Sequence, residues 1–234
     1  MTKSALLAAA AVVALSASGA SAGTHKITSN AHATAKSQIH HWNKALNRSI
    51  STLYDQNDDS QGYSDISQNF ESTFDQYDAQ GADDFTVPAH TTWAISEVDA
   101  SGLYFNGSGP ARDFHVTFYK NHGGKPGAVV ADIPDASYTD VGFGSPVINL
   151  GQKVKLKGKG GGKTYWVSIY ANMDFEVGGE WGWGTRNDAN GNDAQWQNPG
   201  DGFATGCTSW SEERDCLGDV GGVDHMFTLR GKSK

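Results

Sequence analysis

Between residues 92 and 229 the chain is a succession of short segments in which apolar and polar positions alternate. Phe114, Val116 and Phe118, for example, alternate with His115, Thr117 and Tyr119, and this period of two is typical of a strand with one buried face. Glycine, asparagine and proline pairs stand between the segments, as turns require. The pattern predicts strands over residues 92–98, 114–118, 129–133, 147–150, 153–156, 164–171, 181–185, 194–197 and 226–229.

About nine short strands separated by turns, with no helical pattern between them, predict an all-β fold. We expect an antiparallel β-sandwich of the jelly-roll type. The last strand, which ends near Gly231, is expected to pair with an early strand and close the domain. The composition agrees, because the chain has 29 glycines and 11% aromatic residues, which favours turns and short strands.

The first 22 residues have the three parts of a secretory signal peptide. Lys3 supplies a positive start, residues 5–15 are almost unbroken apolar residues, and Ala20 and Ala22 supply the small side chains of a cleavage site. The apolar stretch is too short to cross ~30 Å of hydrocarbon as a helix. We therefore expect a bacterial protein that is cleaved after Ala22 and secreted, without a membrane span.

Residues 23–52 show little strand pattern. Ile39, Trp42 and Leu46 are spaced three or four residues apart, which allows a weak amphipathic helix over residues 37–53 or, equally well, a flexible linker. The β-sandwich domain is expected to occupy residues 53–231.

Two cysteines, Cys207 and Cys216, lie close together in the sequence. In a protein that enters an oxidising compartment, such a pair predicts a disulfide that closes a short loop. Loop closure of this size stabilises a fold by about 2–3 kcal/mol. We expect this role to be structural.

Four stretches of the chain carry a family resemblance: LYDQNDDSQGYSDISQNFESTFDQYDAQGADDFTVP, FHVTFYKNHGGKPGAVV, WGWGTR and WQNPGDGF. They resemble a class of secreted bacterial β-sandwich domains that occur alone or attached to extracellular proteases and cell-surface proteins. The resemblance spans about residues 53–231. It implies a secreted β-sandwich and brings no catalytic residues with it.

The formal net charge of −8 narrows the range of partners. An acidic chain lacks the electrostatic attraction that drives non-specific binding to nucleic acids, and anionic membrane surfaces are disfavoured for the same reason. The only basic run, residues 153–163, is interleaved with glycine and is expected to be a solvated hairpin.

Three tryptophans near the C-terminal end are the candidate ligand-binding residues. Trp181 and Trp183 share one face of a strand because they are two residues apart, and Trp196 follows shortly after. Exposed indoles would stack on the C–H faces of a sugar, so we expect a glycan or another cell-surface ligand at Trp181, Trp183 and Trp196. If the same side chains are buried, they fill the sandwich core instead.

Calcium is the one cofactor that the sequence suggests. Asp188, Asn190 and Asn192 carry oxygens at alternate positions and Asp193 follows, as in the first turn of an EF-hand loop, and residues 55–59 repeat the spacing. The complete EF-hand motif is absent, because Asp193 stands where the motif requires glycine. The alternative is that these Asp and Asn residues simply make turns.

An enzymatic function has weaker support. A glycosidase needs two carboxyl groups at a defined separation, and no spacing singles out such a pair among the available acids. His115 and His225 lie near carboxylates in the sequence, but a single histidine on a strand is more often a hydrogen-bonded structural residue. The acids considered are Asp174, Glu176, Glu180, Glu212, Glu213 and Asp215.

These observations predict a secreted, non-catalytic β-sandwich that binds an extracellular ligand, with carbohydrate as the leading candidate. The alternatives are a glycosidase-like hydrolase with an unrecognised carboxylate pair and a purely structural surface or matrix protein. Solvent exposure of the three tryptophans discriminates between them.

Overall fold

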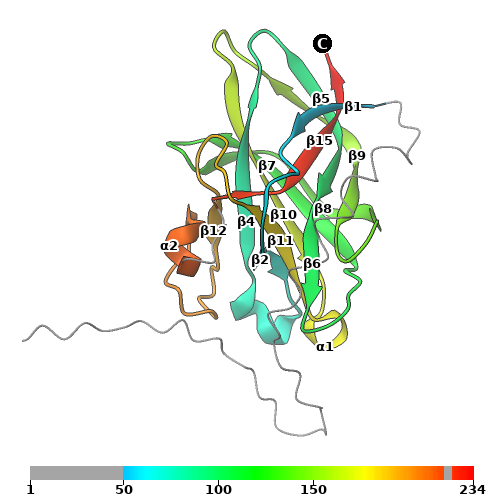
Figure 1. Ribbon diagram of the computed structural model, residues 1–234, viewed down its shortest axis with the longest axis vertical. Coiled ribbons are helices and arrows are strands. Elements are labelled where there is room, and N and C mark those ends of the chain that lie inside the picture. The colour runs from blue at the N-terminus through cyan, green and yellow to red at the C-terminus, as the bar shows by residue number, and fades with distance from the viewer. Residues whose placement is uncertain (1–49, 219–222) are drawn as a thin grey trace, which may run out of the picture.

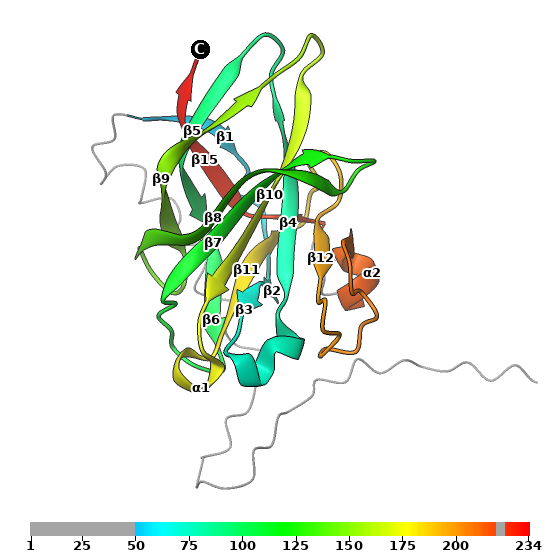
Figure 2. The same ribbon diagram turned by 180° about the vertical axis from the view of Figure 1, so that it is seen from behind.

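The computed structural model describes residues 50–218 and 223–234 and confirms the all-β fold (Figures 1 and 2). The predicted signal peptide, residues 1–22, and almost all of the segment 23–52 lie outside the described residues. The strands are β1 (Ser51–Asp55), β2 (Ser60–Ile66), β3 (Gln68–Asn69), β4 (Gln80–Val87), β5 (Thr92–Ala100), β6 (Gly102–Phe105), β7 (Asp113–Asn121), β8 (Pro126–Asp140), β9 (Pro146–Lys157), β10 (Lys163–Asn172), β11 (Glu180–Arg186), β12 (Gln195–Gln197), β13 (Ser211–Glu212), β14 (Asp224–His225) and β15 (Phe227–Ser233).

Each predicted strand overlaps an observed one, but several observed strands are longer than predicted: β8, for example, runs over Pro126–Asp140, where the alternation predicts residues 129–133. Residues 147–150 and 153–156 are two parts of the single strand β9. Residues 51–53, where the spacing allowed the end of a weak helix, belong instead to strand β1. The described helices are short: η4 (Ser72–Tyr77), α1 (Phe175–Gly178) and α2 (Glu213–Leu217).

The larger sheet has the strand order β1-β15-β5-β9-β8-β7-β10-β4-β12-β13, with β3 paired to β10. Its pairs are antiparallel except for β3 with β10. The last strand, β15, lies between β1 and β5, which confirms that the C-terminal strand pairs with early strands.

The larger sheet curls around an aromatic core. Phe85 of β4 lies within 6.4 Å, between ring centroids, of rings from four other strands: Trp93 of β5, Phe118 of β7, Tyr165 of β10 and Phe227 of β15. Strands that lie far apart in the sheet order therefore meet at one side chain. This arrangement is a sandwich formed largely by one sheet folded on itself.

The second sheet is centred on β11. It has the order β14-β11-β2, with β6 also paired to β11, and all seven residues of β11 are buried. Trp181 and Trp183 point into the main core, while Gly182 and Gly184 lie on the other face under close cover. A Cβ at Gly184 would be only 3.0 Å from the Ser101 carbonyl oxygen.

The predicted disulfide joins Cys207 and Cys216. It closes the loop that leads from β12 to α2, and Asn198 near the start of this loop is held by a hydrogen bond from its backbone N–H to the Cys207 carbonyl, at 2.8 Å. The bond therefore secures one peripheral loop beside the sheet.

The close cover of β11 predicts which glycines the fold requires. A Cβ at Gly182 would lie 2.9 Å from Ser64 Cβ and 3.1 Å from Phe105 Cε1, so we expect Gly182→Ala to lower the free energy of unfolding by about 1–3 kcal/mol through overpacking. Gly161→Ala is the control, because a Cβ there meets nothing within 4 Å. Urea denaturation measures both variants, and equal stabilities of the two would contradict the packing described.

Candidate functional site

The three candidate tryptophans are buried. Trp181 and Trp183 are 0% exposed and Trp196 is 1% exposed. Their indole N–H groups donate to backbone carbonyls, Trp181 to Gly144 at 2.7 Å, Trp183 to Met226 at 2.9 Å and Trp196 to Ile66 at 2.9 Å. The expectation of an exposed sugar-stacking surface on these residues is therefore wrong, because β11 is packed on both faces and the indoles belong to the core.

The candidate calcium loop is held by two buried carboxylates. The Asn190 backbone N–H donates to Asp224 Oδ2 at 2.5 Å, and Asn192 donates its backbone N–H and its side-chain amide to the two oxygens of Asp84, at 3.1 and 2.7 Å. The loop thus presents N–H donors to acids. Asp188 contributes its backbone carbonyl to Arg186 at 3.0 Å.

The calcium site remains a prediction. In the described part of the chain, no group of three or more His, Cys, Asp or Glu side chains is arranged to hold a metal ion. The contacts of Asp188, Asn190 and Asn192 account for the spacing of the loop as turn and capping chemistry. The structure shows no separate role for Asp193 beyond a backbone carbonyl that accepts from Gln195 Nε2 at 3.1 Å.

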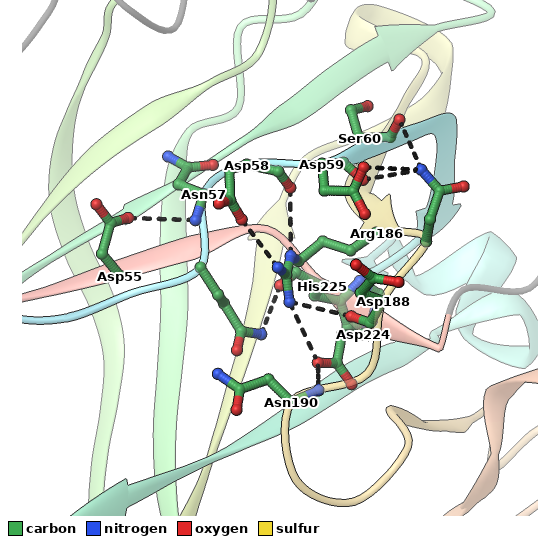
Figure 3. A network of polar contacts seen from close by, with 12 residues as sticks. Asp55, Asn57, Asp58, Asp59, Ser60, Arg186, Asp188, Asn190, Asp224 and His225 are labelled. Carbon is green, nitrogen blue, oxygen red and sulfur yellow. Dashed lines mark hydrogen bonds and ion pairs between the residues drawn. The ribbon is translucent and has the colours of Figure 1, made fainter.

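The Arg186 side chain contacts both loops in which oxygen-bearing side chains alternate, residues 55–59 and 188–193 (Figure 3). It donates to the side chain and the carbonyl of Asp58, at 2.9 and 3.2 Å, and lies 3.6 Å from Asp224 Oδ2. Beside it, the Asn187 amide donates to Asp59. Residues 55–59 and 188–193 are therefore parts of one polar network around a single, mostly buried guanidinium.

His225 stands at the inner end of this network. Its ring stacks on Trp183 with 4.2 Å between centroids and 5° between planes, and its Nε2 lies 2.8 Å from Glu213 Oε2. Both His225 and Glu213 are 0% exposed, and burial lowers the pKa of His225 to about 4. A histidine enclosed in this way cannot reach a substrate; it fixes α2 to the second sheet.

Two further acids share the interior with this histidine. Asp83 Oδ2 accepts from Gln56 Nε2 at 2.7 Å and from the His225 backbone N–H at 2.6 Å. Burial, and next the charge of Asp224, raises the pKa of Asp83 well above its usual range. Burial likewise raises the pKa of Asp224 to about 7, against the opposing effects of the Asn190 N–H and the Arg186 guanidinium.

This burial makes stability depend on pH. The native state holds a proton on Asp224 that the unfolded chain releases, since the pKa falls from about 7 to 3.8 on unfolding. The proton on Asp224 therefore adds to the free energy of unfolding, and this stabilisation is complete below about pH 4 and is lost as the pH rises to about 7. Asp224→Asn removes this loss, so urea denaturation should show the variant gaining stability relative to the wild type across this range. Asp215→Asn, at an exposed position of α2, is the control, and a wild-type-to-variant difference that is constant with pH would contradict the assignment.

A surface pocket lies on the outer face of the larger sheet, beside β3 and η4. Its volume is about 180 Å³, which corresponds to roughly six water molecules. We call it the Tyr170 pocket. The residues that line it are Gln68, Asn69, Asp75, Asp78, Gln80, Tyr170 and Pro199.

Tyr170 is held by a chain of hydrogen bonds across three strands. Its hydroxyl lies 2.6 Å from His115 Nδ1, and His115 Nε2 lies 2.7 Å from Asp132 Oδ1, which also accepts from Thr117 Oγ1 at 2.7 Å. The Tyr170 and His115 rings stack with 4.5 Å between centroids. These contacts fix the phenol before any ligand arrives.

The protons in this chain can be assigned. Partial burial raises the pKa of Asp132, but hydrogen bonds from His115 and Thr117 outweigh it and the net shift is downward, so Asp132 is an ionised acceptor. An ionised Asp132 takes a hydrogen bond from His115 Nε2, and in that tautomer of the imidazole Nδ1 accepts from the Tyr170 hydroxyl. Burial, and next the neighbouring Tyr119, raises the pKa of Tyr170, which keeps the phenol protonated. A phenol oxygen that donates one hydrogen bond keeps the capacity to accept another.

The other polar groups of the pocket are also mostly acceptors. Burial raises the pKa of Asp78 to about 6, with the Phe70 N–H opposing and the charge of Asp75 adding to the shift. Gln80 Oε1 already accepts from Gln197 Nε2 at 2.9 Å, so this side chain offers its amide N–H donors as well as a second oxygen lone pair. No basic side chain is among the lining residues. The pocket therefore suits a ligand that donates hydrogen bonds and disfavours an anion.

The sequence places His115 near carboxylates and favours a hydrogen-bonded structural histidine, and it gives no indication of Tyr170. The alternation in β7 places His115 and Thr117 opposite the core face, and this was visible in the sequence. The partner was not, because Tyr170 meets His115 through the register of β10 against β7. Among the acids considered for catalysis, Glu213 is buried beside His225 and Glu180 is hydrogen-bonded to Asn106.

No protein-family model, curated protein or solved structure matches this chain. In the described ranges, 50–218 and 223–234, no helix has the length and apolar character needed to cross a membrane.

Proposed function

We propose that the protein is a secreted, non-catalytic β-sandwich that binds carbohydrate in the Tyr170 pocket. The proposal keeps the ligand class suggested by the sequence and moves the site away from Trp181, Trp183 and Trp196. The observation that carries it is the acceptor-rich lining around an oriented tyrosine. Sugar hydroxyls donate hydrogen bonds readily, and planar carboxyl and amide groups receive them in pairs.

Secretion is supported by the signal-peptide pattern of residues 1–22 and by the use of both cysteines in a disulfide, since such bonds persist in oxidising compartments. The pocket volume, about 180 Å³, suits a single sugar unit better than a long polysaccharide chain. We therefore expect a terminal or branching sugar of an extracellular or cell-surface glycan as the partner.

Tyr170→Phe tests the site directly. The variant keeps the ring and removes the oriented oxygen, which leaves a ligand hydroxyl without its acceptor, so affinity for neutral saccharides should fall about tenfold or more. Isothermal titration calorimetry against a panel of neutral mono- and disaccharides measures the loss. Tyr63→Phe removes a hydroxyl from a half-exposed ring on β2 and should bind as the wild type does. Equal affinities of Tyr170→Phe and wild type would refute the assignment.

The carboxyl of Asp78 predicts how binding depends on pH. Because its pKa lies near 6, a rise from about pH 5 to 7 ionises it and strengthens the hydrogen bonds it accepts. Saccharide affinity should therefore increase over this range and be flat in Asp78→Asn. An identical pH profile for Asp78→Asn and the wild type would show that Asp78 does not contact the ligand.

A hydrolase is the second candidate, and one observation favours it. Asp75 and Asp78 both line the pocket, and a carboxyl group with a raised pKa is the usual general acid in glycoside hydrolysis. Release of reducing sugar from a polysaccharide panel, lost in Asp78→Asn, would promote the hydrolase above the binding protein. A purely structural role, favoured by the burial of the tryptophans, would be supported if no saccharide binds.

A further inference from the structure

Seven lysines that are spread over two parts of the sequence meet at one end of the molecule. Lys155 of β9 and Lys232 of β15 are both register partners of Ala94, on the strand β5 that lies between them. Register partners project their side chains from the same face of a sheet. Lys155 and Lys232 therefore stand on one face, on either side of a small residue.

The backbone brings the C-terminal residue to the same place. Lys157 is the register partner of Thr92, and Thr92 exchanges two backbone hydrogen bonds with Lys234, at 2.8 and 3.0 Å. Figures 1 and 2 show the C-terminal end beside the hairpins β4–β5 and β9–β10. We call this region the lysine end; its cations are Lys153, Lys155, Lys157, Lys159, Lys163, Lys232 and Lys234.

The lysine end has no acidic side chain within its own segments to offset its positive charge. The segments that form it, residues 88–95, 151–164 and 231–234, contain no aspartate or glutamate. None of these lysines takes part in the ion pairs found among the described residues. All but Lys163 are exposed, and Lys163 lies over the Tyr165 ring at 4.7 Å from its centroid. The whole chain has a net charge of −8. Positive charge that is concentrated at one end of such a chain indicates a binding surface.

We propose that the lysine end binds an acidic polysaccharide. The alternate lysines of β9 stand about 6.6 Å apart along the strand, and the strands β9 and β15, with β5 between them, lie about 9.5 Å apart. A linear polymer with a carboxylate on successive sugar units presents charges at comparable intervals. Lysine, a hydrated point charge on a flexible stem, suits such a polymer without fixed geometry.

Other polyanions fit the surface less well. The segments of the lysine end contain no arginine, and none of the exposed large hydrophobic side chains, Tyr63, Val129, Val130, Phe143 and Val177, belongs to them. Single-stranded nucleic acids are usually held by aromatic stacking and arginine, and a peripheral membrane protein inserts apolar side chains. The lysine end offers neither.

The inference does not rest on the function proposed for the Tyr170 pocket. The strand β3, whose two residues line that pocket, lies toward the end of the molecule opposite the C-terminal residue (Figure 2). The two sites also have opposite preferences, since the pocket lining is acidic and the lysine end is basic. One experiment can therefore separate them.

Binding of the full chain to polygalacturonate, compared with its fully methyl-esterified form, tests the proposal. We expect binding to polygalacturonate that weakens with added NaCl, and little binding to the neutral ester. Lys155→Gln/Lys232→Gln should weaken binding about tenfold or more at low salt, and the slope of log K against log salt should fall in magnitude by about 1.4. Arg112→Gln/Arg214→Gln removes the same charge from exposed positions elsewhere and should bind as the wild type does.

Three outcomes would overturn the proposal. One is equal loss in both double variants, which would indicate a response to net charge alone. Another is equal binding of the acid and the ester. The third is tighter binding to a single-stranded oligonucleotide or to vesicles with anionic lipid than to polygalacturonate. Tyr170→Phe should leave polygalacturonate binding unchanged, so failure of the pocket assignment and failure of this one are distinguishable.

Discussion

Two indoles can be buried side by side in one strand only if the backbone between them accepts close cover on its other face. Strand β11 meets this condition with Gly182 and Gly184, and all of its residues are buried. Trp181 then packs on Phe114, with 4.9 Å between ring centroids, and Trp183 packs on His225 and Phe227. The second sheet is attached to the curled larger sheet through these rings, so the burial that removes the tryptophans as a binding surface is also what holds the two sheets together.

This packing takes charged groups into the interior with it. His225 is stacked on Trp183, and its neighbours include Glu213, Asp83 and Asp224, all of them 0% exposed. Such groups remain buried only when they are hydrogen-bonded, paired or neutralised by a proton. Arg186 and the N–H groups of the loop 188–193 supply part of this compensation. The acidic loops that resemble cation sites in the sequence thus stabilise the fold, and the accessible polar surfaces lie elsewhere, in the Tyr170 pocket and at the lysine end.

The strands with clear alternation, such as β7, and the disulfide could be predicted from the sequence alone. Strand β4 could not be predicted in this way, because Asp83 and Asp84 are both buried and break the alternation of apolar and polar positions. The same two-residue spacing of Trp181 and Trp183 fits an exposed platform or a core, and only the cover over the glycine face decides between them. The contact of Tyr170 with His115 joins residues 55 positions apart, and it depends on a strand register that no local pattern encodes. The lysine end depends in the same way on β15 pairing with β5.

The most direct test of this account is a nuclear magnetic resonance titration of the isotope-labelled protein with a saccharide that it binds. We predict chemical-shift changes at the side-chain amides of Asn69 and Gln80 and in the ring of Tyr170, with the indole N–H signals of Trp181, Trp183 and Trp196 unmoved. Shifts concentrated in the three indoles, with the signals of the Tyr170 pocket unchanged, would contradict it.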